Sequence, residues 1–358
     1  MTFIQKNDKM ELTTEQKHVL YHIVKDVRGG KKQITMGGFA GAGKSFLITY
    51  LIKFFPDYAI AAYTGKATNV LRKKGLKNAS TIHSRIYKPF FQDGMIYFDL
   101  NPDPDCSGFI IDESSMLSED IYDDLKSYDM PIIAVGDHGQ LEPIGSNFNL
   151  MKNPDYTLEE IHRNAGDIAR FAETLRYGYA PRGFKCSDGT VDLVSRTTVD
   201  DYMDVDQVIC AYNKTRVQIN TEVRKALGHK GIVNEGERVM CLRNNKQLGL
   251  FNGMQGTVVG LHTGRRGRKC MDFEFDGTIM KDIWYDPKQF GQESHAKLLG
   301  KNTPNPFDYA YCVTAHKAQG DEWEKVLVIE QRCANWSHSR WSYTCASRAK
   351  TKLIWRMS

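Results

Sequence analysis

The segment 38–45, with the sequence GFAGAGKS, constrains the fold of this chain more than any other. It matches the pattern G-x-x-x-x-G-K-[ST], in which glycines let successive backbone N–H groups turn inward around phosphates. An apolar run at 34–36 precedes it, and a helix is expected over 46–54, with the positive end of its dipole at the nucleotide. Lys44 would reach the β- and γ-phosphates, and the Ser45 hydroxyl would hold Mg²⁺. A glycine-rich turn that matches by chance is the alternative.

The first half of the chain alternates short apolar runs with helical patterns. The runs predict buried strands at 34–36, 58–63, 109–111 and 132–135, and the helical patterns include 14–27 and 64–74. This alternation predicts a parallel sheet covered by helices. Phosphate sites in such sheets lie at the carboxyl ends of the strands, which is where the glycine-rich segment falls.

Residues 86–108 interrupt this alternation of predicted strands and helices. Two runs, 86–91 and 95–100, flank Asp93-Gly94, a pair that favours a tight turn, so a β-hairpin is expected. The turn is surrounded by Phe90, Phe91, Tyr97 and Phe98.

The second half changes character twice. Residues 208–212 predict another buried strand, whereas 231–300 contain short strands with glycine turns, typical of a small all-β insertion. The α/β pattern resumes at 309–313 and 325–329. The polar, weakly patterned stretch 181–200 indicates a linker or a surface excursion.

Composition sets wide limits. The chain has 358 residues, 41% of them hydrophobic and 25% charged, which suits a soluble protein of two or three domains. A net charge of +5 permits a nucleic-acid partner without requiring one. The eight cysteines form no C-x-x-C pair and no zinc-site spacing, so reduced thiols in a cytosolic protein are expected. No signal peptide or membrane span is expected.

Two further strand ends carry polar residues. Asp112 and Glu113 follow an apolar strand; in a P-loop NTPase the first acid holds the Mg²⁺ shell and the second orients or deprotonates the attacking water. A strand followed by an acidic helix cap is the alternative. The segment 135–143, VGDHGQLEP, ends a third strand, and Gln140 there can sense the γ-phosphate, although a Gly-Asp turn with a proline would look similar.

Together these residues resemble the superfamily 1 helicases, particularly the 5′→3′ branch, superfamily 1B, which contains RecD-like and Dda-like helicases. The resemblance covers most of the chain. The matching segments are 14–16 (the adenine-reading glutamine motif), 38–45, 61–67, 80–83, 112–115, 136–143, 158–163, 313–323 and 343–350. One departure is Ser347, where the family usually has threonine; both residues carry a hydroxyl.

The resemblance implies ATP and Mg²⁺ as cofactors. The implied catalytic residues are Lys44, Glu113, Gln140, Arg163 and Arg348, and the implied nucleotide-binding residues are Gln16, Gly41, Gly43, Lys44, Ser45, Phe46, Asp112, Gly320 and Glu322, with Ser45 and Asp112 at the metal. The γ-phosphoryl transition state spreads negative charge that the two arginines, arriving from a second domain, can neutralise. A surface ion pair is the alternative for each arginine.

The resemblance also implies contacts to DNA. They fall on Thr64, Lys66, Thr81, His83, Phe98, Thr314 and His316, where hydroxyls and backbone N–H groups grip phosphates. A helix-capping threonine or a satisfied loop histidine is the alternative at each position. The basic turn 264–269 either touches phosphates or is a solvated hairpin tip. The hairpin aromatics either anchor a small β unit or act as a separation pin.

The expected fold is therefore α/β, with two RecA-like parallel-sheet P-loop motor domains. Motor domain 1A is expected over 1–162 with the hairpin insertion 86–108 (1B), domain 2A over 163–230 and 301–358, and an SH3-like β insertion (2B) over 231–300.

The expected function is ATP-dependent unwinding of duplex DNA during 5′→3′ movement on a single strand. An RNA helicase of the same superfamily and an ATPase that remodels protein–DNA complexes remain alternatives. The expected partners are single-stranded and forked DNA, together with replication or recombination proteins. We expect a monomer without membrane association, in the cytoplasm of a prokaryotic cell or a phage-infected host.

Overall fold

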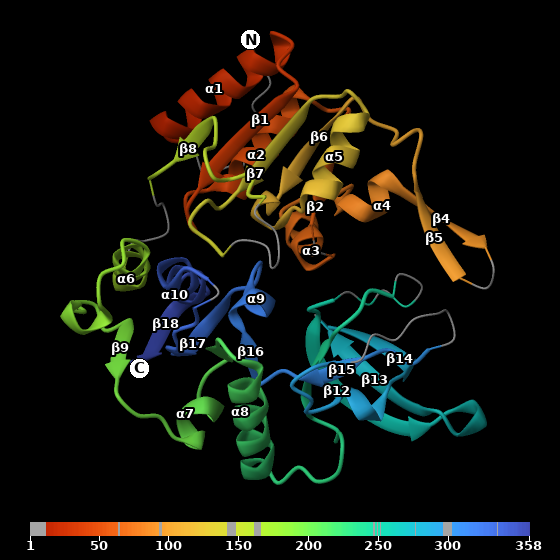
Figure 1. The fold of residues 1–358 in the computed structure, drawn as a ribbon, viewed down its shortest axis with the longest axis vertical. Helices are drawn as coiled ribbons and strands as arrows, with labels where there is room; N and C mark the ends of the chain where they lie inside the picture. Colours follow the sequence, from red (N-terminus) through yellow and green to blue (C-terminus); the bar gives the residue numbers. More distant parts are fainter. Residues whose placement is uncertain are drawn as a thin grey trace.

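The computed structural model describes residues 12–358, except for 64, 93–94, 142–147, 161–165, 246–247, 249, 251, 276, 296–302 and 335, and without the side chains of Lys66 and 89–98. Three parts are visible in Figure 1: a parallel sheet in red to yellow at the top, a second parallel sheet in green and blue at the lower left, and an antiparallel sheet in cyan at the lower right. Within the described residues, no helix combines the length and apolar character needed to cross a membrane.

The first sheet has six parallel strands in the order β3-β2-β6-β7-β1-β8. Its strands are β1 (Gln33–Gly38), β2 (Tyr58–Ala62), β3 (Ser80–Thr81), β6 (Gly108–Asp112), β7 (Ile132–Gly136) and β8 (Tyr156–Leu158). Its helices are α1 (Thr14–Arg28), α2 (Lys44–Phe54), α3 (Gly65–Lys73), α4 (Ile82–Ile86) and α5 (Glu119–Ser127), with the short helix η1 (Ser114–Met116). The four predicted strands all lie in this sheet. The other two, β3 and β8, are too short to give a pattern.

Burial explains why these strands read as continuous apolar runs. Every residue of β6 and β7 is buried, because helices cover both faces of the sheet. On one face Ile110 and Val135 share a cluster with Leu47, Ile48 and Leu51 of α2. This packing fixes where α2 begins relative to β1, and so it holds the segment 38–45 at the carboxyl edge of the sheet.

The second parallel sheet has the order β16-β10-β17-β18-β9. Its strands are β9 (Val191–Val194), β10 (Gln207–Cys210), β16 (Cys312–Thr314), β17 (Trp323–Ile329) and β18 (Ala349–Arg356), and its helices are α6 (Asp167–Arg176), α7 (Val199–Met203), α8 (Asn213–Ala226), α9 (Ala315–Ala318) and α10 (His338–Ala346). The prediction of a linker or surface excursion over 181–200 is wrong at β9, which pairs with β18. An edge strand buries only part of its side chains, so β9 lacks a continuous apolar run.

The antiparallel sheet has the order β14-β13-β12-β11-β15. Its strands are β11 (Arg238–Cys241), β12 (Gln255–Thr263), β13 (Lys269–Phe275), β14 (Thr278–Trp284) and β15 (Phe307–Tyr309). The single strand predicted at 309–313 is wrong. The chain leaves this sheet after Tyr309 and enters the parallel sheet at Cys312. Residues 307–313 are all buried, so hydrophobicity gives no sign of the break.

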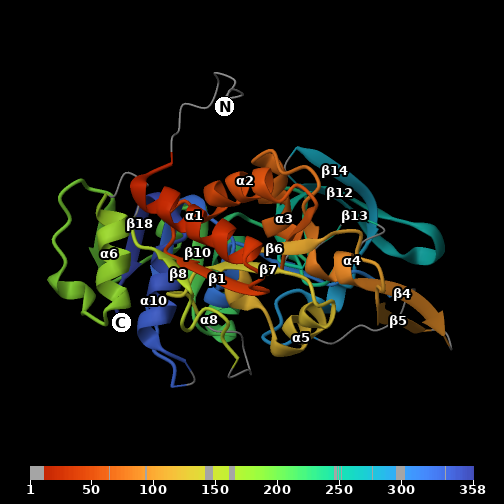
Figure 2. The same cartoon turned by 90° about the horizontal axis from the view of Figure 1, so that it is seen from above.

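The predicted hairpin forms from β4 (Tyr87–Gln92) and β5 (Met95–Leu100), with Phe90 opposite Tyr97. It projects away from the first sheet in both Figure 1 and Figure 2. Its base is tied to α5, because the Tyr87 hydroxyl donates to Asp124. The turn residues 93–94 and the side chains of the four aromatics lie outside the described part of the chain.

Candidate active site

The glycine-rich segment joins β1 to α2 as a tight loop. Gly41 and Gly43 have φ values of 88° and 80°, in the left-handed region that strains any residue with a Cβ. Gly38 is favoured for a different reason, because a Cβ there would lie 3.1 Å from Cγ of Lys44, closer than an ordinary van der Waals contact. The backbone therefore has the phosphate-loop conformation that the sequence predicts.

Lys44 folds back onto this loop. Its Nζ donates to the carbonyl oxygens of Gly38 at 2.8 Å and Phe39 at 2.9 Å, and lies 3.8 Å from Oδ2 of Asp137. These partners are backbone carbonyls, which phosphate oxygens can replace when the loop closes around a nucleotide. The ammonium is thus positioned by the loop itself.

The two acids at the end of β6, Asp112 and Glu113, lie beside the phosphate loop. Ser45 Oγ donates to Asp112 Oδ2 at 3.4 Å, and the Glu113 N–H donates to Asp112 Oδ1 at 3.0 Å. Burial raises the pKa of Asp112, and burial followed by the charge of Asp112 raises the pKa of Glu113 to about 7. Glu113 also has a left-handed φ of 53°, a strained conformation that is concentrated at functional sites.

The acids fit a cation and a water molecule. Oε2 of Glu113 is buried and has no hydrogen-bond partner among the described residues. Two raised carboxyl pKa values and an unsatisfied buried oxygen indicate that a positive group belongs here. The oxygens of Ser45 and Asp112 are ligands that Mg²⁺ prefers. The residues therefore fit the magnesium site that the resemblance implies.

The segment after β7 adds a buried carboxylate. Asp137 accepts hydrogen bonds from the Gly139 N–H at 2.9 Å, Gln140 Nε2 at 3.0 Å and the Tyr343 hydroxyl at 3.0 Å. Oε1 of Gln140 is buried and lacks a partner among the described residues. Residues 142–147, which include the end of this predicted motif, are not among those described.

Asp137 and Tyr343 are functional candidates to which the sequence motifs assigned no individual role. A signal for Asp137 existed, because it lies directly after β7, and Asp112 is the last residue of the neighbouring strand β6. Tyr343 begins the matching segment 343–350, but no sequence pattern linked it to Asp137, which lies 206 positions earlier in the chain.

Helix α10 of the second sheet closes this site from the other side. The Leu141 N–H donates to Thr344 Oγ1 at 2.9 Å, Arg340 Nη1 donates to the Gln140 carbonyl at 3.1 Å, and Gln319 Nε2 donates to the Leu141 carbonyl at 3.1 Å. Figure 1 shows α10 directly below the first sheet. The site is therefore built from both parallel sheets.

A cavity of about 370 Å³ lies at this junction. The loop contributes Phe39 and Ala40 to its wall, and the second part of the chain contributes Arg176, Tyr343 and Lys350. The Phe39 ring packs with the core of the second sheet, and the Arg176 guanidinium lies 3.9 Å from the centre of that ring. The phosphate loop is thus in direct contact with both halves.

Arg348 follows α10 and is buried. Its Nε donates to the Thr344 carbonyl at 3.0 Å, its Nη1 to the Asp321 carbonyl at 3.1 Å and its Nη2 to Ser347 Oγ at 2.8 Å. Its positive charge opposes the larger effect of burial, which raises the pKa of Glu113. The hydroxyl of Ser347 orients the guanidinium, so serine supplies the group that threonine has in the family.

The other predicted nucleotide contacts are Gln16, Phe46, Gly320 and Glu322. The Gln16 carboxamide accepts from the Thr13 N–H at 3.1 Å in the capping box of α1 and donates to the Ala42 carbonyl at 3.4 Å. It therefore reaches the phosphate loop, but both its ends are already hydrogen-bonded. Phe46 lies in the first turn of α2 with its ring 5.1 Å from that of Tyr50. Gly320 has a φ of 81° in the turn after α9, and Glu322 lies two residues further on, partly buried.

Two of the predicted DNA contacts, Thr81 and Thr314, lie at the carboxyl ends of strands, one in each parallel sheet. Thr81 ends β3 and caps α4, accepting from the Ser84 N–H at 3.2 Å, so the capping alternative is observed. His83 is exposed, with its ring 5.5 Å from that of Tyr87. Thr314 ends β16 and precedes α9. The His316 ring lies 5.4 Å from that of Trp336, and burial lowers its pKa.

Four predicted site residues are not placed by the structure. Arg163 and Thr64 lie outside the described residues, and the side chains of Lys66 and Phe98 lie outside the described side chains.

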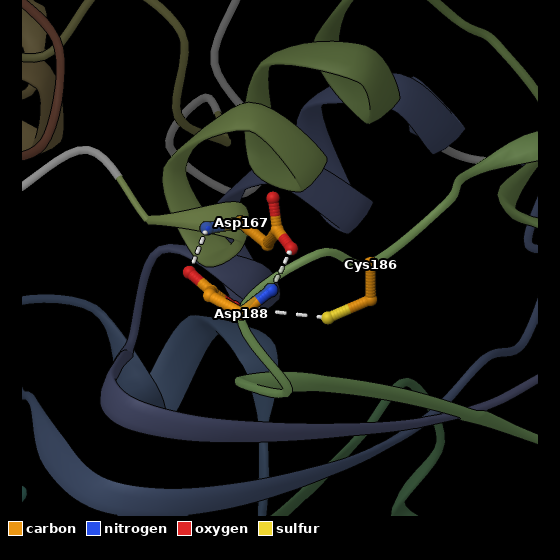
Figure 3. Close-up of side chains that lie close together, drawn as sticks. All are labelled: Asp167, Cys186 and Asp188. Atoms are coloured by element: carbon orange, nitrogen blue, oxygen red, sulfur yellow. Dashed lines mark hydrogen bonds between the residues drawn. The ribbon is translucent and has the colours of Figure 1, made fainter.

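A separate cluster of Asp167, Cys186 and Asp188 lies at the start of α6 (Figure 3). The Asp167 N–H donates to Asp188 Oδ2 at 2.8 Å, and the Asp188 N–H donates to Asp167 Oδ2 at 2.9 Å. Asp167 also pairs with Arg170 at 2.9 Å. The carboxylates already have N–H partners, so we interpret the cluster as the tie between α6 and the loop that leads to β9.

We expect Asp167→Asn to lower the melting temperature at pH 7. The hydrogen bond from the Ser187 N–H, first among several, holds the pKa of Asp167 well below its usual range. The unfolded state, with a pKa of about 3.9, then binds more protons, so the stabilisation is present above about pH 4 and is lost as the pH falls further. Thermal melts from pH 3 to pH 7 should show a shallower acid dependence for Asp167→Asn. The exposed Asp57→Asn should behave as wild type, and equal slopes for all three proteins would contradict this role.

Comparison with known proteins agrees with this geometry. Residues 11–194, just over half of the chain, match the family model described as "AAA domain". The chain belongs to this family. Residues 309–354 match a second model, "UvrD-like helicase C-terminal domain". The AAA match contains Lys44, Glu113 and Asp137, and the UvrD-like match contains Tyr343 and Arg348, so the two matched regions meet at the site described above.

Two curated relatives of this AAA-family chain are helicases. The ATP-dependent DNA helicase dda of Enterobacteria phage T4 is 27% identical over 253 residues, which cover 61% of this chain and 57% of that protein. The ATP-dependent RecD2 DNA helicase of Deinococcus radiodurans is 24% identical over 392 residues, which cover 98% of this chain and 50% of that protein. The chain thus spans about half the length of the curated relatives it matches.

Solved structures show the same fold. A Pif1 helicase structure described as the basis for DNA unwinding at forked dsDNA has a TM-score of 0.66 and 20% identity, and covers 97% of this chain and 92% of that chain. Bacteroides Pif1 bound to ssDNA has a TM-score of 0.64 and 18% identity, over 98% of this chain and 93% of that one. At these identities the likeness concerns the fold. The predicted fold of two RecA-like domains and the predicted relationship to superfamily 1B are confirmed.

Proposed function

We propose that the chain is an ATP-dependent DNA helicase that moves along single-stranded DNA and separates duplex. The observation that carries this proposal is the shared site. Helix α10 of the second sheet is hydrogen-bonded both to the phosphate loop, from the Ala40 N–H to the Tyr343 hydroxyl, and to the segment after β7, from the Leu141 N–H to Thr344 Oγ1. A nucleotide bound there would contact both halves, so its hydrolysis would change how the halves are joined. The printed names of the relatives, ATP-dependent DNA helicases, support the same function.

Each residue of the site would have its own role in ATP hydrolysis. Lys44 exchanges its loop carbonyls for phosphate oxygens, and Arg348 neutralises charge that develops on the γ-phosphoryl group. Ser45 and Asp112 would hold Mg²⁺, which when bound supplies charge compensation at the β- and γ-phosphates. Oε2 of Glu113 and Oε1 of Gln140, which have no hydrogen-bond partner among the described residues, would accept the hydrogens of an attacking water. We propose the same role for Arg163 as for Arg348, on the family resemblance.

Movement requires two gripping surfaces. We propose that Thr81 and His83 in the first motor domain and Thr314 and His316 in the second face the DNA, together with Thr64, Lys66 and Phe98. The 5′→3′ direction rests on the resemblance to superfamily 1B. We propose the domain bounds 1–162, 163–230 with 301–358, and 231–300, to which β15 adds the strand Phe307–Tyr309.

The proposal extends to partners and place of action. Titles of the similar structures name ssDNA and forked dsDNA, and we propose both as ligands of this chain. We also propose that it acts as a monomer beside replication or recombination proteins, in the cytoplasm of a prokaryotic cell or a phage-infected host.

ATP hydrolysis measured with no nucleic acid, with single-stranded DNA and with single-stranded RNA tests this function. We expect stimulation of at least tenfold by DNA, and separation of a forked duplex in the presence of Mg²⁺ and ATP. Preferential stimulation by RNA would favour an RNA helicase. Stimulation by DNA without strand separation would favour an ATPase that remodels protein–DNA complexes.

Replacing residues 92–96 by a short Gly-Ser linker should reduce unwinding of a forked duplex at least fivefold. Residues 92–96 lie between Phe91 and Tyr97, and a flexible linker there would no longer hold the hairpin aromatics at the fork. Stacking of an aromatic ring on a base is worth about 1–3 kcal/mol, comparable with about 1.4 kcal/mol for a base-pair step. The hairpin projects from the motor and is tied to it at its base by Tyr87 and Asp124, so its tip can be changed without disturbing the core. DNA-stimulated ATPase and single-strand translocation should stay within twofold. A parallel fall of all three activities would show that the hairpin is structural.

A further inference from the structure

We propose that Tyr343 and Asp137 form a positioning pair that sets the carboxamide of Gln140 from the second motor domain. The inference rests on the proposed ATPase function and assigns roles to two residues that touch no phosphate themselves. The contact joins residues 206 positions apart, from α10 of the second sheet to the end of β7 in the first.

The hydrogen bonds run in one direction. The Ala40 N–H in the phosphate loop donates to the Tyr343 hydroxyl at 2.9 Å, and that hydroxyl donates to Asp137 Oδ2 at 3.0 Å. Burial raises the pKa of Tyr343 well above its usual range, so the hydroxyl keeps its proton. Its single proton is directed at Asp137, and its lone pair is directed at the loop.

Asp137 passes this orientation to Gln140. Because Oδ2 of Asp137 accepts from Gln140 Nε2 at 3.0 Å, the carboxamide oxygen must point the other way. That oxygen is buried and has no partner among the described residues. A buried acceptor without a donor is costly, so the arrangement is retained for a donor that arrives with the substrate. The attacking water is a donor of the right kind.

Packing and charge also fix the position of the Tyr343–Asp137 pair. A Cβ at Gly139 would lie 2.9 Å from Cε1 of Tyr343, so the ring is in contact with the turn that carries Gln140. Asp137 further lies 3.8 Å from Nζ of Lys44. When phosphates draw Lys44 away, the three hydrogen bonds to Asp137 keep the buried carboxylate satisfied, and Gln140 keeps its orientation.

Tyr343→Phe removes the hydroxyl and keeps the ring. For the full chain with saturating single-stranded DNA, we expect kcat for ATP hydrolysis to fall about tenfold, with KM for ATP within threefold of wild type. Loss of the Gln140 orientation slows the chemical step and leaves the binding of ATP unchanged, so kcat falls while KM stays nearly constant. Tyr202→Phe is the matched control, since it removes the hydroxyl of a buried tyrosine in the same half of the chain, which among the described residues is hydrogen-bonded to Thr197 at 3.0 Å. It should leave both constants unchanged.

Asp137→Asn tests the next step. Its Oδ1 must still accept from the Gly139 N–H, so the new amide group faces Gln140 and forces that carboxamide to turn over. We expect kcat to fall at least tenfold while KM for ATP does not rise. In the double variant, Tyr343→Phe should add less than twofold to the loss, because Tyr343 acts through Asp137.

The outcomes separate two failures. If wild type hydrolyses no ATP with DNA and Mg²⁺ present, the proposed function itself is wrong. If wild type is active and Tyr343→Phe keeps kcat within twofold, or raises KM more than it lowers kcat, or adds its full effect to Asp137→Asn, the positioning pair is wrong.

Discussion

Lys44→Ala is expected to lower kcat for DNA-stimulated ATP hydrolysis by about 10³-fold, to the limit of most assays. Removing one preorganised charge-stabilising donor costs on the order of 10²–10³ in rate, and Lys44 is the cation that the phosphate loop itself positions. The loop should keep its shape, because Gly41 and Gly43 set it through their own φ values rather than through the lysine. Circular dichroism and thermal melting should therefore match wild type.

Lys53→Ala provides the control on the same helix. Lys53 is exposed in the last turn of α2, and its ammonium lies over the Tyr50 ring at 4.5 Å. Its removal should change ATPase activity less than twofold. If Lys44→Ala hydrolysed ATP at a near-wild-type rate that DNA still stimulated, the assignment of this site would be wrong.

Arg348→Ala is expected to lower kcat about 10²-fold or more while nucleotide affinity stays within about tenfold. An arginine that acts on the transition state contributes on the order of 10³–10⁵ in related phosphoryl transfers. The measurement is kcat from steady-state ATPase together with the Kd of a fluorescent ATP analogue. Loss of affinity alone would show that Arg348 is an ordinary binding residue.

Arg348 also has a structural role, since it donates to two backbone carbonyls and to Ser347. Arg348→Lys separates the two roles, because it keeps the charge but loses the planar fork of donors. We expect it to recover part of the stability lost in Arg348→Ala and little of the rate. Arg332→Ala, at an exposed position outside the site, should leave both unchanged.

Where a feature depends on a few neighbouring residues, the sequence predicted it well. The phosphate loop follows from local backbone geometry, and its glycines have the positive φ values or close contacts that exclude other residues. The fully buried central strands carry unbroken apolar runs, so β6 and β7 were visible as well. The acid pair Asp112 and Glu113 was found because carboxyl ends of parallel strands share one edge of the sheet.

Prediction failed where one stretch of chain serves two neighbours. Residues 307–313 are buried throughout, yet the first three belong to the antiparallel sheet and the last two to the parallel one. Hydrophobicity reports burial but not which sheet provides it. At β9 the reverse holds, because an edge strand buries too little to be recognised.

The sequence by itself thus determined the phosphate loop, the acids that follow β6 and the two-motor family relationship, since each depends on residues within a short window or on their order along the chain. Only the tertiary structure decided how the halves meet. The contact of Tyr343 with Ala40 and Asp137 depends on how the two parallel sheets place a helix against a loop. No local pattern specifies that geometry, because it follows from the packing of side chains such as Phe39 and Leu141 into the core of the opposite half.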